Sequence, residues 1–123
     1  ESVPAAVAAL DGARTEPHPL VDVSVAGSTV GKAVFDATLV TAEAARISEY
    51  AVETATDSIG QFRADGVTVA APAGSPGYAR RGGGPVVAPA DSMGVVAPIA
   101  PFHTNPDHWL VPLDGLSVTV DEA

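Results

Sequence analysis

The segment from Arg63 to Pro85, RADGVTVAAPAGSPGYARRGGGP, contains residues whose types and spacing are suited to binding a ligand. An apolar stretch over 67–71 is typical of a buried strand, and a loop rich in glycine and proline follows it directly. Small residues let a backbone approach a bound molecule closely, because they place no side-chain bulk in the way. We expect Ser75 to cap a short helix with Pro76 at its first position, and the glycine run 82–84 to end it. The segment therefore predicts a strand, a tight turn, one or two helical turns and a stop.

Short β-strands account for most of the remaining chain and would hold this loop in place. Alternating apolar and polar residues predict two hairpins, one turning at Gly27–Ser28 and the other at 57–60. Ser2 is typical of a helix cap and Asp11–Gly12 of a helix end, so a short helix is expected over 2–10. The expected strands cover 20–26, 29–40, 46–56, 61–71, 94–99, 109–112 and 116–120. The pattern predicts a mainly β fold, an antiparallel β sandwich with a short N-terminal helix and one short helix after the glycine-rich loop.

The composition is typical of a single folded domain. At 123 residues with 46% hydrophobic residues, the chain can bury a core, and its 12 Gly and 11 Pro indicate many turns. The absence of cysteine from the sequence excludes disulfides, thiolate catalysis and cysteine metal sites. No apolar run is long enough to span a bilayer, and no leader-like segment begins at Glu1. We therefore expect one domain over residues 1–123 of a soluble, cytoplasmic protein.

Acidic residues dominate the charge of the chain. The formal net charge is −9, from 15 acidic and 6 basic residues, and Lys32 is the only lysine. Nucleic-acid binding requires a basic stripe, which the pair Arg80–Arg81 does not provide, so this class of partner is excluded. An acidic, lysine-poor chain rich in Ala and Val is typical of a salt-loving organism, in which carboxylates hold water and salt screens their repulsion. The alternative is that a GC-rich genome alone produced this composition.

The glycine-rich segment resembles the signature of the NAD kinase family. In that family an arginine-x-aspartate-glycine precedes a strand, then TPTGSTAY and a spacer ending in GGP; the matching residues here are RADG, APAGSPGY and ARRGGGP, without a gap. AVFDATLV over 33–40 is similar to a strand that begins ALNE or ALND in the family, and VVAPIAPF over 95–102 is similar to its later Pro-x-x-Pro segment. The resemblance covers nearly the whole chain. It implies the family's C-terminal β domain, without the preceding α/β domain that carries a GGDG loop.

The resemblance also implies a binding site for NAD or NADP. It places Asp65 against the base of the dinucleotide and Asp36 on ribose hydroxyls, where a carboxylate can accept from two neighbouring donors. It implies that Tyr78 stacks on a base or on the nicotinamide ring. The other residues that it implies bind the cofactor belong to the loop: Gly74, Ser75, Gly77 and Arg81. Without the resemblance, Asp65 is an ordinary exposed turn residue, Tyr78 packs beneath the loop, and the arginine is solvated.

Several positions depart from the family's pattern. Phe35 replaces an asparagine, offers no hydrogen bond and is a candidate core residue. Ala71, Ala73 and Pro76 replace threonines, and Arg81 replaces a serine, so hydroxyls are lost at each of these positions. Each loss removes a hydrogen bond worth about 1 kcal/mol. We therefore expect any dinucleotide binding to be weak.

Phosphoryl transfer from ATP is not expected of this chain alone, because it needs a base, a magnesium-held triphosphate and close positioning. In the family these come from the GGDG domain, so ATP and Mg²⁺ are expected only where that domain is present, and no catalytic residue is assigned to this chain.

The first interpretation of the function is a NAD(H)- or NADP(H)-binding and oligomerisation domain, because the family completes each site with a neighbouring subunit of a homo-oligomer. One alternative is a structural module with a lapsed site. Another is a fragment of an active ATP:NAD 2′-phosphotransferase whose N-terminal kinase domain lies elsewhere.

The sequence HTNPDH over 103–108 invites interpretation as a metal site. His103 and His108 lie five positions apart across an Asn-Pro turn, which is not the spacing of a helical metal pair. The remaining histidine, His18, is distant in sequence. We therefore expect these residues to form a polar turn and expect no metal site.

The acidic composition predicts that stability depends on salt. Added KCl should raise the melting temperature, because it screens repulsion among the carboxylates of a chain with net charge −9. Thermal unfolding followed by circular dichroism in low and in molar KCl measures this. A melting temperature that is indifferent to salt would leave the GC-rich genome as the better explanation of the composition.

Overall fold

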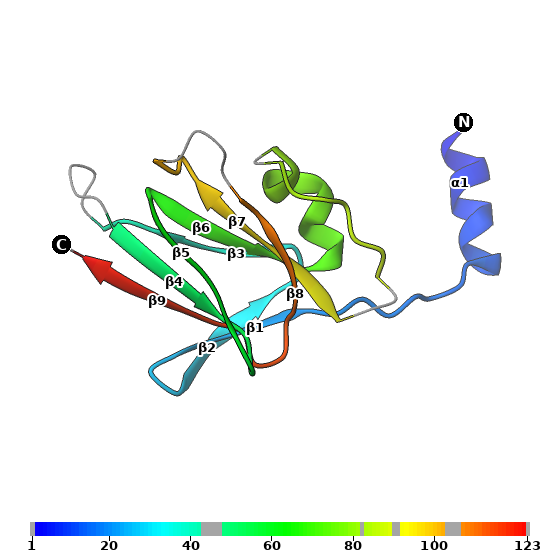
Figure 1. Ribbon diagram of the computed structural model, residues 1–123. Coiled ribbons are helices and arrows are strands. Elements are labelled where there is room, and N and C mark those ends of the chain that lie inside the picture. Colours follow the sequence, from blue (N-terminus) through cyan, green and yellow to red (C-terminus); the bar gives the residue numbers. More distant parts are fainter. Residues whose placement is uncertain (1, 43–47, 82, 90–91, 103–106, 123) are drawn as a thin grey trace.

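Antiparallel β-sheets make up most of the molecule in a computed structural model, which describes residues 2–42, 48–81, 83–89, 92–102 and 107–122. Within these residues three sheets have the strand orders β1-β2, β3-β6-β7-β8 and β5-β4-β9. The strands are β1 (Val21–Val25), β2 (Ser28–Ala33), β3 (Asp36–Val40), β4 (Ser48–Glu53), β5 (Ser58–Ala64), β6 (Gly66–Ala70), β7 (Met93–Ile99), β8 (Trp109–Pro112) and β9 (Ser117–Glu122). The second and third sheets face each other, which confirms the predicted antiparallel sandwich (Figure 1).

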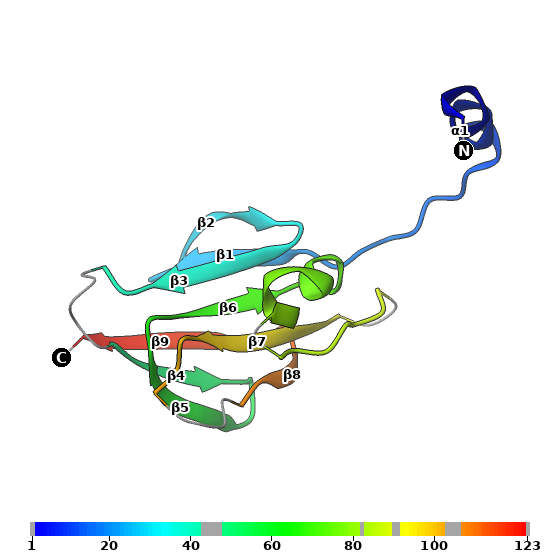
Figure 2. The same cartoon turned by 90° about the horizontal axis from the view of Figure 1, so that it is seen from above.

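The predicted N-terminal helix is present as α1 (Val3–Ala9). The Ser2 side chain caps it by accepting a hydrogen bond from the Ala5 N–H at 3.3 Å, and a short 3₁₀ turn, η1 (Leu10–Gly12), ends it as expected. No residue of α1 is buried. Both views show α1 standing away from the sheets at the end of an extended connection (Figures 1 and 2). No helix in the described part of the chain is long and apolar enough to cross a membrane.

The first hairpin was predicted correctly, but its turn and its second strand were not. The turn residues are Ala26 and Gly27, with φ of 51° and 84°, rather than Gly27–Ser28. A two-residue hairpin turn of this kind needs a left-handed backbone at both central positions. The strand predicted over 29–40 is also interrupted after β2, because β3 pairs with β6 in another sheet. One straight strand cannot belong to two sheets, so the chain bends at Val34 and Phe35.

The second hairpin, β4 and β5, turns three residues earlier than predicted. Thr54 and Asp57 close the turn: the Thr54 N–H donates to the Asp57 carbonyl at 2.8 Å, and the Asp57 N–H donates to the Thr54 hydroxyl at 3.0 Å. This side-chain hydrogen bond fixes the turn at 54–57 and releases 58–60 into β5. The predicted start of β4, at 46–47, lies outside the described residues.

The core lies between the two larger sheets. Three aromatic rings stack in a row, with centroids 5.8 Å apart for Tyr50 and Phe62 and 5.6 Å apart for Phe62 and Trp109. Gly60 lies beneath the row, where an added Cβ would meet the Trp109 ring at 2.6 Å. The other buried members of this core are Val52, Ala64, Val67, Val69, Val96 and Val111. The aromatic row therefore ties β4, β5 and β8 together across the sandwich.

Strand β6 is buried along its whole length and carries the glycine-rich loop at its end. One of its faces contributes Val67 and Val69 to the core, while Ala70 on the other face packs in a smaller cluster with Ala79 of the loop. The loop runs through η2 (Pro72–Gly74), a 3₁₀ turn, and η3 (Ser75–Ala79), a π-helical turn that continues helically to Arg81. The predicted order of strand, tight turn and one or two helical turns is confirmed.

Candidate functional site

The glycine-rich loop lies directly against the start of β3. The Ala71 N–H donates to the Phe35 carbonyl at 2.8 Å, and Asp36 pairs with Ala70 in the β3–β6 register. Two segments that are distant in sequence therefore form one surface. Antiparallel pairing is the reason, since it places the first residue of β3 beside the last residue of β6.

Gly74 is the closest point of this contact. A Cβ built on Gly74 would overlap the carbonyl group and the Cα of Phe35, so no side chain fits there. Gly74 itself has an ordinary right-handed backbone, with φ of −92°. The requirement for glycine is therefore close approach of two backbones rather than an unusual turn.

Ser75 fastens the loop to the segment that follows it. Its side chain is fully buried; the hydroxyl donates to the Pro72 carbonyl at 2.8 Å and accepts from the Val87 N–H at 2.8 Å. The prediction that Ser75 caps the helix is wrong, because η3 begins with Gly74 in the capping position and has no side-chain cap. The hydroxyl proton and one lone pair of Ser75 are thus used within the fold.

The outer side of the loop is open to solvent. Pro76, Gly77, Arg80 and Arg81 are exposed, and a Cβ on Gly77 would have no atom within 4 Å. Tyr78 lies in η3, but its side chain is outside the described part of the structure. The two arginines place positive charge on the exposed side of the loop in a chain of net charge −9. An anionic group approaching this side would meet favourable charges.

The predicted end of the helix at the glycine run is confirmed for its described members. The Gly83 N–H donates to the Arg80 carbonyl and the Gly84 N–H to the Ala79 carbonyl, both at 2.9 Å. Gly83 has φ of +96°, the left-handed conformation that ends helices. Gly84 is buried, and a Cβ there would meet Val95 Cγ1 at 2.8 Å. Gly82 lies outside the described residues.

Phe35 and Asp36 enter β3 beside the loop with different exposures. The side chain of Phe35 is 63% exposed, so the expectation that it is a core residue is wrong. The bend between β2 and β3 holds its backbone under the loop and leaves its side chain outside the sandwich. Asp36 is half-buried at the first position of β3. Its carboxylate is the acidic group that the fold brings to the edge of the loop.

Asp65 lies at the other end of β6 from the loop. Its carbonyl accepts from the Thr41 N–H at 2.9 Å and from the Thr41 hydroxyl at 3.1 Å, and its N–H donates to Ile99 at 2.9 Å. The side chain is exposed. With five residues of β6 between the two ends, Asp65 and Asp36 are roughly 17 Å apart along the strand. The structure thus brings Asp36 and the loop together but leaves Asp65 apart from both.

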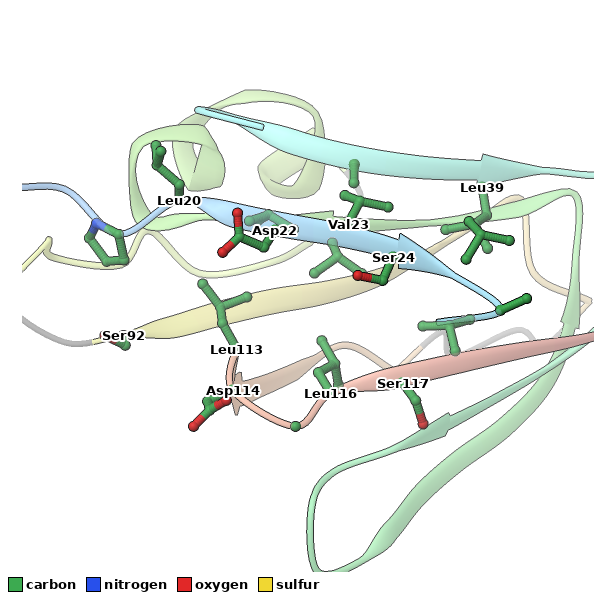
Figure 3. Close-up of a pocket in the computed structure, with 18 of the residues that line it drawn as sticks. Leu20, Asp22, Val23, Ser24, Leu39, Ser92, Leu113, Asp114, Leu116 and Ser117 are labelled. Carbon is green, nitrogen blue, oxygen red and sulfur yellow. The ribbon is translucent and has the colours of Figure 1, made fainter. Parts of the chain in front are cut away.

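The structure also contains a groove with a mixed polar and apolar lining that the sequence analysis did not predict. It has a volume of about 770 Å³ and lies beneath β1, where Leu39, Leu113 and Leu116 form much of its wall. Figure 3 shows Leu113 and Leu116 reaching toward β1. The only sequence signal is the alternation of valines in β1, which also fits an ordinary hairpin. Of the predicted cofactor-binding residues, none whose side chain the structure describes lines this groove.

The metal-site interpretation of 103–108 falls partly outside the described residues. His103 is among those left undescribed, and His108 is exposed. Within the described ranges, no three His, Cys, Asp or Glu residues are grouped closely enough to hold a metal ion.

The chain is similar in sequence to a known protein family and to several NAD kinases. The model of the ATP-NAD kinase C-terminal domain matches residues 35–121. NAD kinase of Methanosarcina barkeri is 35% identical over 94 residues, which are 76% of this chain and 34% of that protein. NAD kinase of Methanospirillum hungatei is 31% identical over 113 residues, 87% of this chain and 42% of that protein. The chain thus spans between a third and a half of these relatives.

Solved structures with the same fold include two kinases. A crystal structure of an NAD kinase from Archaeoglobus fulgidus in complex with ATP matches with a TM-score of 0.76 and 25% identity, over 96% of this chain and 47% of that one. Yeast NADH kinase complexed with NADH matches with a TM-score of 0.65 and 20% identity, over 85% of this chain and 31% of that one. The second similarity concerns the fold alone.

The contact at Gly74 predicts a matched pair of alanine variants. Gly74→Ala should destabilise the fold by about 3 kcal/mol, because its Cβ overlaps the Phe35 backbone and overpacking costs about this much. Gly31→Ala is the control, since a Cβ on this residue of β2 meets no atom within 4 Å, and it should change stability by less than about 0.5 kcal/mol. Urea unfolding of both variants measures the difference. Equal stability of the two would show that the loop can lift away from β3 at little cost.

Proposed function

Because this chain belongs to the NAD kinase family through its match to the ATP-NAD kinase C-terminal domain, we propose that it binds NAD(H) or NADP(H) and self-associates, without transferring phosphate by itself. The observation that carries the proposal is the contact of the glycine-rich loop with β3. It sets a carboxylate, Asp36, beside a loop of small residues whose outer side is open and carries positive charge.

The chemistry of this surface suits a dinucleotide. A carboxylate such as Asp36 accepts from two vicinal hydroxyls at once, as a ribose presents them. The exposed Gly77 lets a ligand approach the loop backbone, and Arg80 and Arg81 supply charge for a pyrophosphate. A nucleotide, ATP, is also the ligand of the structural neighbour from Archaeoglobus fulgidus.

Phosphoryl transfer requires groups that we assign to a separate N-terminal kinase domain. Such a domain would supply the base and the site for ATP and Mg²⁺ that positioning of the triphosphate needs. The exposed apolar side chains of Val3 and Val7 in α1 and of Leu10 in η1 form a suitable surface for contact with it.

The purified chain is therefore predicted to produce no NADP from NAD, ATP and Mg²⁺. Chromatographic detection of NADP tests this, with a full-length NAD kinase as the positive control. NADP formation by the purified chain would overturn this part of the proposal.

Self-association is proposed because the two aspartates are far apart within one copy. Asp36 and Asp65 lie at opposite ends of β6, roughly 17 Å from each other, whereas a base and its own ribose are neighbours. A second copy could bring its Asp65 to the loop of the first, in a symmetric pair with two equivalent sites. Within the described residues, the edge strands of the two larger sheets are β3, β8, β5 and β9. Edge strands have backbone groups that association can cover.

Calorimetry with NAD in molar KCl tests the binding site. Binding should be one to two orders of magnitude weaker than micromolar, because two or three hydrogen bonds of about 1 kcal/mol are lost. Asp36→Ala and Asp65→Ala should each weaken it about tenfold or more, the usual effect of removing a charged hydrogen-bond partner. Asp121→Ala, an exposed change in β9 with the same effect on net charge, should leave it unaltered. Affinity that is indifferent to both Asp36 and Asp65 would contradict the proposed site.

Mixing the two aspartate variants tests whether sites are shared between copies. If Asp36 of one copy and Asp65 of another form one site, a mixed pair regains one intact site, and about a quarter of all sites recover. No recovery on mixing, together with a monomer in sedimentation at high concentration, would place the site within a single copy.

A structural module is the second candidate function. The observation in its favour is that the loop has lost the hydroxyls expected of the family, while the one it keeps, on Ser75, is used within the fold. The absence of heat at millimolar NAD would make this module the better explanation.

A further inference from the structure

Phe35 is an exposed aromatic residue whose backbone lies against the glycine-rich loop. Tyr50, Phe62 and Trp109 stack together inside the sandwich, whereas the Phe35 side chain is 63% exposed. A large apolar side chain in water gives up the stabilisation that burial would provide. This exposure leaves the ring of Phe35 accessible to a bound molecule.

The backbone of Phe35 is held more firmly than its exposure suggests. Its carbonyl accepts from the Ala71 N–H at 2.8 Å, and its Cα and carbonyl lie directly against Gly74. The next residue, Asp36, pairs with Ala70 in the sheet. The Cα of Phe35 thus cannot move away from the loop unless the β3–β6 pairing opens. With its backbone fixed, only the two side-chain torsions of Phe35 remain to be ordered when a ligand binds to it.

The surroundings of Phe35 favour contact with a ring rather than polar recognition. Ala71 and Ala73 bring no side-chain donors to this part of the loop, and the Ser75 hydroxyl is engaged with Pro72 and Val87. The exposed Pro76 adds another apolar surface in η3. A planar base can be held against an aromatic face without such donors, because every base has a π-face.

We propose that Phe35 is a platform on which the base of a bound nucleotide stacks. The inference rests on the proposed function, since it concerns the same site, and it names the ligand class as nucleotides with a planar base. Stacking of the base then adds to the affinity that the contact of Asp36 with the ribose provides. A sugar phosphate without a base would lack the contribution from stacking.

Titrations of the purified chain in molar KCl, followed by NMR, test the platform. The ligands are NAD, adenosine monophosphate and ribose 5-phosphate, and the variants are Phe35→Ala, Phe35→Leu and Phe35→Trp. Removal of a stacking ring should weaken binding of the two base-containing ligands about tenfold, and leucine should recover only part of this. Tryptophan should keep the affinity, and the base protons of the ligand should shift upfield with Phe35 or Trp but not with Leu. Ribose 5-phosphate should bind equally to all variants.

Val34→Ala is the matched control, because Val34 is the neighbouring exposed apolar residue at 52% exposure. It should leave all affinities unchanged, and the melting temperatures of the variants establish that each is folded.

If the unaltered chain binds no NAD, both the proposed function and the stacking role of Phe35 are wrong. If NAD binds but Phe35→Ala changes its affinity less than twofold, or leucine replaces phenylalanine without loss, the platform alone is overturned. A change in sedimentation without a change in affinity would instead make Phe35 an interface residue.

Discussion

The close approach of two backbones at Gly74 and Phe35 is the constraint on which the candidate site depends. With no room for a Cβ between them, the loop can lie on the start of β3 only if this position is glycine. The Ala71–Phe35 hydrogen bond holds the same contact from one side, and the Ser75 hydroxyl fastens the loop to Val87 from the other. The loop is therefore a packed part of the domain.

Strand β6, which carries the loop, is buried on both faces. The packing of the loop is therefore linked to the stability of the domain. Val67 and Val69 belong to the sandwich core, while Ala70 belongs to the cluster beneath the loop helix. The loop helix thus packs on an inner strand of the four-stranded sheet. The same strand sets the distance between Asp36 and Asp65, because its five residues separate its two ends. A site that uses both aspartates must extend along the strand or include a second copy.

Some polar groups near the loop make hydrogen bonds within the fold, and others are exposed to solvent. The hydroxyl of Ser75 has become part of the fold, and the other hydroxyl positions of the family's loop carry Ala71, Ala73, Pro76 and Arg81. Among the described residues, the groups that remain available are the Asp36 carboxylate, the exposed backbone at Gly77, two arginines and the ring of Phe35. This set favours stacking and charge over hydrogen bonding to neutral groups. It is consistent with a weak nucleotide site, and it differs from the polar loop that the family signature implies.

Local patterns in the sequence were enough to predict the helix cap at Ser2, the strand Trp109–Pro112, the order of elements in the loop after β6, and the sandwich itself. Apolar periodicity, helix caps and glycine each determine the conformation of only a few neighbouring residues, so these signals can be recognised in short segments. The motif spacing likewise identified the family. Only the tertiary structure decided three other features: the break before β3, the exposure of Phe35, and the separation of Asp36 from Asp65. Each depends on which strands pair and in which register, and that is set by contacts between residues far apart in the chain, which no short stretch of sequence encodes.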